Sequence, residues 1–126
     1  MGLFGAISKA MQNSKEKTRL EAAKFSEKIE YADLSFACIL LVREFDRSSL
    51  PVKASISRII RERIAKEENT DELYRAFSDM YDLGNRRPDM VAQNCAQWLG
   101  HRLNQLNDYR VEVKEYDNSK TYIPRD

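Results

Sequence analysis

The spacing of apolar residues along the chain predicts a succession of α-helices. The stretch from Ser14 to Arg47 contains neither glycine nor proline. Within it, apolar residues recur at alternating intervals of three and four, which is typical of one face of a helix. These residues are Ala22, Phe25, Ile29, Ala32, Phe36 and Ile39. The stretch is compatible with one helix or two, and we favour a break near Tyr31, because Asp33 is suited to cap a second helix.

The segment 34–42, LSFACILLV, is the most apolar part of the chain. A helix that is apolar on all sides must be enclosed by protein or lipid. Because the segment is far shorter than the roughly 20 residues that cross a bilayer, we predict that protein encloses it as the central helix of a small domain. Residues of this helix and of its neighbours should then be nearly inaccessible to solvent. The predicted core residues are Phe36, Ile39, Leu40, Ile60, Phe77, Trp98 and Leu99.

Three more helices follow from the turn residues and the apolar spacing. Capping hydroxyls and a proline at 48–51 begin the first of them, residues 69–72 open the second, and residues 86–89 begin the third. Gly84 is the predicted end of the second. The predicted buried faces are Val52, Ile56, Ile59, Ile60 and Ile64; then Leu73, Phe77, Met80 and Tyr81; then Val91, Cys95, Trp98, Leu99, Leu103 and Leu106.

After Asn107 the apolar period changes from that of a helix to that of a strand. Tyr109, Val111 and Val113 alternate with charged residues, and the residues 117–119 are suited to turn the chain back. A short hairpin is marginal unless it has a surface to lie on. We therefore predict an all-α fold: a single compact bundle of four to five helices over 1–126, with an amphipathic N-terminal segment (1–12) and an extended segment or hairpin at the C-terminus (108–126).

Composition narrows the choice of partners and of cellular compartment. The 126 residues include 21 Lys and Arg against 20 Asp and Glu, a net charge of +1. Such a balance produces no long-range field towards nucleic acid or anionic membranes. Cys38 and Cys95 both lie in apolar patterns, which favours reduced, buried thiols in a cytosolic protein. A cytoplasmic location is expected, since no apolar signal core follows a basic start.

Residues suited to catalysis are scarce. His101 is the single histidine, which excludes metal sites that need two, and it is expected to be a partly exposed helix residue. The apolar surroundings of Cys38 disfavour the thiolate that a nucleophile needs. No glycine-rich phosphate loop is present. We predict a protein that is not an enzyme and has no catalytic residues, cofactor or metal, while a site built from carboxylates, Arg and Tyr stays open.

The N-terminal segment is the first candidate binding surface. An apolar stripe on a helix is formed by Leu3, Phe4, Ile7 and Met11. Three surfaces are open as the place where this stripe docks: the core of the protein itself, a partner protein or a membrane. Residues 2–7, GLFGAI, resemble the opening of the influenza hemagglutinin fusion peptide. The residues that follow lack the glycine-rich, acidic continuation of that peptide, which argues against a membrane as the main partner.

The second candidate surface is the basic helix 51–67. Lys53, Arg58 and Arg61 could contact phosphates, and Arg86 and Arg87 could extend the patch. The other interpretation is a solvated face whose cations pair with nearby glutamates.

From these features we expect a protein that acts by binding another protein or a second copy of itself. The leading hypothesis is a cytosolic regulator, adaptor or immunity-type inhibitor of a bacterial or phage kind. The alternative is a nucleic-acid-binding regulator that uses the helix 51–67.

Overall fold

The computed structural model describes the backbone of residues 3–125 and the side chains of Lys9 and of residues 12–125. Five α-helices and one antiparallel hairpin lie within that part of the chain, which confirms the predicted all-α bundle with a C-terminal hairpin. The elements are α1 (Leu3–Ile29), α2 (Leu34–Phe45), α3 (Leu50–Lys66), α4 (Thr70–Arg86), α5 (Met90–Gln105), β1 (Val111–Tyr116) and β2 (Ser119–Pro124).

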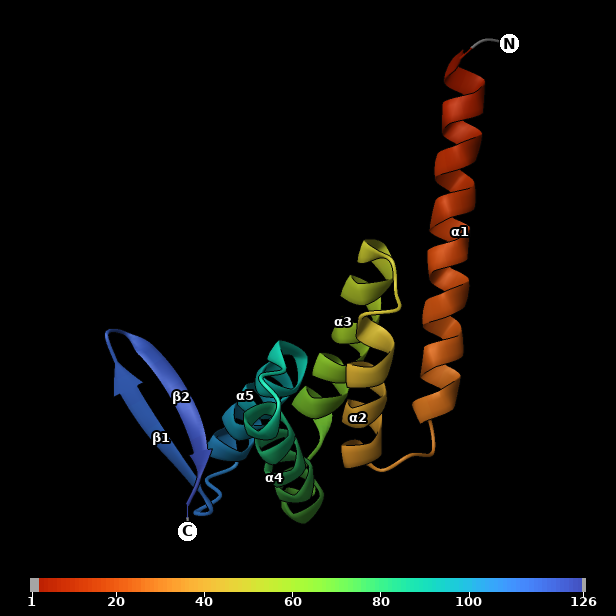
Figure 1. Ribbon diagram of the computed structural model, residues 1–126. Coiled ribbons are helices and arrows are strands. Elements are labelled where there is room, and N and C mark those ends of the chain that lie inside the picture. The colour runs from red at the N-terminus through yellow and green to blue at the C-terminus, as the bar shows by residue number, and fades with distance from the viewer. Residues whose placement is uncertain (1–2, 126) are drawn as a thin grey trace.

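The helices are arranged around α2, α4 and α5. The helix α4 packs most extensively on α5, and α2 contacts α4, α3 and α5. The helix α1 lies mainly against α3, and the hairpin lies on α5 and α4. Figure 1 shows the hairpin at one end of the molecule and α1 at the other, with the N-terminal half of α1 extending well beyond α2 and α3.

The predicted break near Tyr31 is confirmed. The helix α1 ends at Ile29, and α2 begins after Asp33, whose side chain accepts a hydrogen bond from the Phe36 backbone N–H at 2.7 Å. This is the capping role that the sequence indicated. The carboxylate of Glu72 also accepts a hydrogen bond from the Leu34 backbone N–H at 2.9 Å. The start of α2 is therefore satisfied by one local and one distant carboxylate.

The predicted core is confirmed in part. Ile60, Phe77 and Leu99 are fully buried, together with Leu34 and Leu41. The prediction was wrong for Phe36, which is 48% exposed. Ile39, Leu40 and Trp98 are only half-buried at the edge of the core.

The exposure of Phe36 has a geometric cause. Successive residues of a helix are rotated by about 100°, so Phe36 lies on the side of α2 opposite to Leu34, Ala37 and Leu41, which are buried. The partners α3, α4 and α5 cover that buried side. One side of the most apolar helix is thus left in contact with solvent, and the expectation of complete enclosure was incorrect.

Two predicted helix boundaries also need correction. Gly84 does not end α4, which continues to Arg86; it is buried within the helix against Gln93. A Cβ atom at Gly84 would lie 2.8 Å from the Gln93 Cγ atom, and the Gln93 side chain donates a hydrogen bond to the Gly84 carbonyl at 3.0 Å. Glycine therefore allows close packing here. The last helix begins only after Asp89, which caps it.

The capping predictions differ in outcome. Asn69 caps α4 by accepting a hydrogen bond from the Glu72 backbone N–H at 3.1 Å. Ser49 occupies the capping position of α3, but its hydroxyl makes no capping hydrogen bond. The Ser48 hydroxyl instead donates to the Glu44 carbonyl at 2.8 Å, at the end of α2. One of the two predicted capping hydroxyls thus serves the preceding helix.

The C-terminal hairpin has the surface that it requires. Asp117 and Asn118 have φ values of 53° and 67°, the left-handed geometry of a tight two-residue hairpin turn. Tyr122 is buried on α5, where the Gln97 side chain accepts from its N–H at 2.8 Å and donates to its carbonyl at 3.1 Å. Gly100 permits this contact, since a Cβ atom there would lie 2.3 Å from the Tyr122 Cβ atom.

Candidate functional site

The N-terminal half of α1 is the part of the molecule that is most separated from the bundle. Each side chain from 12 to 17 is exposed, and among the side chains of α1 that the structure describes the first buried one is that of Phe25. Leu20, an apolar residue in the middle of α1, is 49% exposed. Figure 1 shows this half of α1 rising above the other helices. It is the candidate site for a partner.

The residues predicted to bind a partner belong to this half of α1. Leu3, Phe4, Ile7 and Met11 lie within its helical backbone, and their side chains lie outside the described residues. Their shared apolar face therefore stays a prediction from the sequence. Nearby, Glu16 and Arg19 form an ion pair at the surface.

The structure divides the cations of the basic helix into two groups. Arg58 and Arg61 are exposed on α3, which is compatible with a phosphate-binding face and equally with a solvated face. Lys53 instead lies over the ring of Phe45, with its Nζ atom 5.0 Å from the ring centroid. Arg86 and Arg87 are exposed at the end of α4.

Arg63, the remaining arginine of α3, has a structural role. Its guanidinium donates to the carbonyl oxygen of Ile29 at 2.9 Å and to that of Ala32, and it lies 3.8 Å from the Glu72 carboxylate. It thus satisfies backbone carbonyls where α1 ends and joins this turn to α3 and α4. Its position seven residues after the buried Ile56 could have indicated an inward direction.

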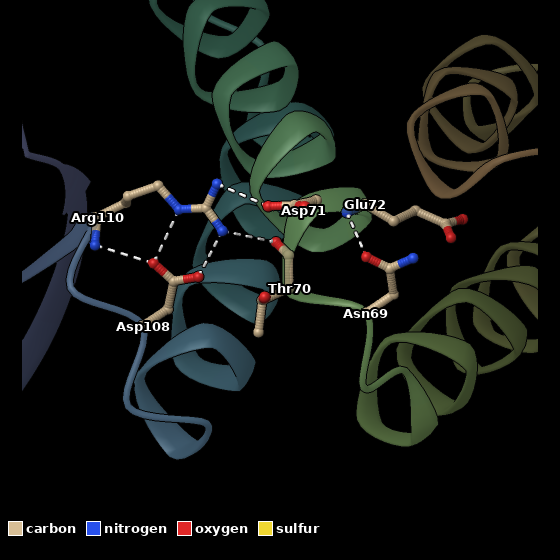
Figure 2. A network of polar contacts seen from close by, with 6 residues as sticks. All are labelled: Asn69, Thr70, Asp71, Glu72, Asp108 and Arg110. Atoms are coloured by element: carbon tan, nitrogen blue, oxygen red, sulfur yellow. Dashed lines mark hydrogen bonds and ion pairs between the residues drawn. The ribbon is translucent and has the colours of Figure 1, made fainter.

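Arg110 forms a polar network that sequence reasoning missed (Figure 2). Its guanidinium donates to Asp108 at 3.0 and 2.7 Å, to Asp71 at 3.1 Å and to the Thr70 carbonyl at 3.3 Å. It also lies over the Tyr74 ring, 4.5 Å from the centroid. This is a cluster of carboxylates, arginine and tyrosine, and each nitrogen of the guanidinium donates a hydrogen bond to a protein atom. The network joins the α5–β1 connection to the start of α4.

We expect the Asp108–Arg110 pair to make the protein sensitive to acid. The hydrogen bonds from Arg110 lower the pKa of the Asp108 carboxyl from its ordinary value, although burial acts in the opposite direction. A carboxyl whose pKa is lower in the folded state than in the unfolded state stabilises the folded protein at pH values above its unfolded pKa of about 4. This contribution is lost as the pH falls through the pKa of the folded state. Asp108→Asn should lower the free energy of unfolding near neutral pH by about 1–2 kcal/mol and flatten its acid dependence.

Urea unfolding between neutral and acid pH would measure this effect. Asp71→Asn is the control, because Asp71 contacts the same guanidinium but its side chain is 88% exposed, against 4% for Asp108. Equal losses of stability in the two variants would show that the buried Asp108–Arg110 pair contributes no more than the exposed contact of Arg110 with Asp71.

The two cysteines are free thiols that are fully buried in the described core, as predicted. Hydrogen bonding with the Cys38 thiol, together with burial, raises the pKa of the Cys95 thiol. Such an environment disfavours the thiolate that nucleophilic chemistry requires.

His101 lies at the surface of α5, with both ring nitrogens in polar contact. Its Nδ1 atom is 2.9 Å from the Tyr122 hydroxyl, and its Nε2 atom is 3.2 Å from the Gln105 side-chain nitrogen. Its ring also packs edge-on to that of Tyr122. In the described part of the chain, no three or more His, Cys, Asp or Glu side chains gather in a way that could hold a metal.

Comparisons with known proteins identify no relative of this chain from which a function could be transferred. No family model, curated protein or solved structure matches the chain. None of the helices between residues 3 and 125 is both long enough and apolar enough to cross a membrane.

Proposed function

We propose that this protein acts without catalysis, by binding another protein through the N-terminal half of α1. Its role would be that of a cytoplasmic regulator, adaptor or immunity-type inhibitor of a bacterial or phage kind. The observation that carries the proposal is the exposure of each side chain from 12 to 17 on a helix that extends beyond its bundle.

A physical argument connects this geometry with a partner. Isolated helices shorter than about 12–15 residues are marginal in water, and most helices in proteins are stabilised by packing an amphipathic face. The first part of α1 has no such packing among its described side chains, yet its sequence contains an apolar stripe at Leu3, Phe4, Ile7 and Met11. A groove on a partner would supply the missing contact, since amphipathic helices commonly bind in apolar grooves.

Other features of the molecule favour this proposal over its alternatives. Lys53 and Arg63 are engaged by neighbouring groups, which leaves fewer free cations on α3 for nucleic acid. Each guanidinium nitrogen of Arg110 already donates a hydrogen bond within the protein, which argues against the carboxylate–Arg–Tyr cluster as an active site. Buried free thiols suit the reducing cytoplasm.

Deleting residues 2–12 tests the proposal. We expect the truncated protein to stay folded, because the described side chains from 12 to 17 are exposed and the first buried one among those described in α1 is that of Phe25. Its far-UV helicity should fall only in proportion to the residues removed. Affinity purification with quantitative mass spectrometry should show about a tenfold loss of the specific partner, which corresponds to about 1.4 kcal/mol. Global unfolding would instead place this segment in the core.

Two full-length variants sharpen the experiment. The double substitution Phe4→Ser with Ile7→Ser should weaken capture as the deletion does. The matched control is Gln12→Ser with Asn13→Ser, which alters exposed polar positions of the same helix. Equal capture by both variants would contradict a role for the apolar stripe, and salt-sensitive retention on DNA would support the nucleic-acid alternative.

A further inference from the structure

A groove of about 310 Å³ lies between α3 and α5, on the other side of α3 from the proposed α1 site. Its lining combines apolar surface with polar side chains. The lining includes Arg61 and Ala65 of α3 and Trp98, His101, Arg102 and Gln105 of α5. Among the residues that the structure describes, no carboxylate side chain lines the groove.

The two arginines of the groove differ in how they are held. Arg102 is fixed, since it donates to the Glu67 carbonyl at 2.9 Å and to the Gln105 side-chain oxygen at 3.3 Å. Arg61 is exposed, with its guanidinium 5.3 Å from the centroid of the Trp98 ring. Among the described residues, it has no ion pair with an acidic side chain. Its donors are therefore available to a ligand.

The lining of the groove follows one face of α5. It extends along α5 from Gln97 to Gln105, which is about 12 Å at the rise of a helix. The ring of His101, held by Tyr122 of the hairpin, lies along the same stretch. A lining of this length can contact several residues of an extended polypeptide segment.

We propose that this groove binds an acidic segment of a partner protein, with a carboxylate on Arg61 and an apolar side chain against Trp98. The positive lining without a carboxylate provides the charge complementarity that selects such a segment and speeds its encounter. Arginine binds carboxylates in a paired geometry, and tryptophan and arginine are the residues most often central to protein interfaces.

The position of Trp98 makes the proposal directly measurable. It is the single tryptophan of the chain, so the intrinsic fluorescence reports on the groove. The full-length protein would be titrated with a short peptide in which glutamates alternate with leucines and alanines. The control probe is the same peptide with glutamine in place of each glutamate. We expect the acidic peptide to shift the emission of Trp98, and raising the salt concentration should weaken its binding.

Two arginines of the same helix supply matched variants. Arg61→Gln should weaken the binding of the acidic peptide about tenfold, whereas Arg58→Gln, which removes the same charge outside the groove, should change it less than about twofold. The proposal would be overturned by equal effects of the two substitutions, by equal binding of the glutamine peptide, or by no change in Trp98 emission. Tighter binding of single-stranded DNA than of the acidic peptide would also overturn it.

The proposals for the groove and for the α1 site can be tested separately. Deletion of residues 2–12 should leave the affinity for the acidic peptide unchanged, because none of the described side chains of α1 lines the groove. A loss of peptide binding on that deletion would contradict the groove as an independent site.

Discussion

Leu41→Ala should lower the free energy of unfolding by about 3 kcal/mol. Substitutions of buried leucines by alanine typically cost about 2–5 kcal/mol. Leu41 is fully buried where α2 meets the rest of the core. The substitution removes apolar surface and leaves a cavity that rigid neighbours can fill only in part. Urea unfolding followed by circular dichroism would measure the loss.

The adjacent residue gives the matched control. Leu40 belongs to the same helix and has the same side chain, but it is only half-buried at the edge of the core. Leu40→Ala should cost about 1 kcal/mol, because its surroundings include solvent and less surface is lost. Equal losses in the two variants would mean that α2 is rotated from the orientation described above.

Arg63→Ala should lower the free energy of unfolding by about 2 kcal/mol, the second largest effect that we expect. The substitution leaves the carbonyl oxygens of Ile29 and Ala32 without their donor and the Glu72 carboxylate without its counter-ion. Unsatisfied polar groups of this kind cost about 1–3 kcal/mol each when buried. The side chain of Arg63 is 25% exposed, so water reduces the penalty and the lower part of the range applies.

Arg58→Ala is the comparison for charge alone. It removes a cation from the same helix at an exposed position, where substitutions usually change stability by less than about 0.5 kcal/mol. Hydrogen exchange would add a local readout, since amides near the end of α1 should lose protection in Arg63→Ala. If the two alanine variants were equally stable, Arg63 would have no role in holding the α1–α2 turn.

Much of the candidate chemistry was predictable from composition and spacing. The buried thiols, the surface histidine and the exposed Arg58 and Arg61 agree with the sequence analysis. The groove was not predicted, because Trp98 was assigned to the core and Arg61 to a phosphate-binding face. No local pattern indicates that the fold brings Arg61 of α3 and Trp98 of α5 together, since they are 37 positions apart in the chain.

The elements of the fold followed from short-range regularities. Periods of three and four marked the helices, Asp33 and Asn69 marked their starts, and the alternation after Asn107 marked the strands. These features act within a few residues, through backbone hydrogen bonds and side-chain caps. They can therefore be read along the chain.

The packing of these elements could not be predicted from the sequence, because it depends on which faces of the helices meet. The apolar residues of α2 pointed to a central helix, but the number and placement of its neighbours left Phe36 in solvent. Gly84, suited to end a helix, instead serves a close contact between α4 and α5. The docking of the hairpin depends on Gly100 meeting Tyr122 across the bundle. Such contacts join residues that are distant in the chain, and their fit depends on the packing of complete elements rather than on any local sequence.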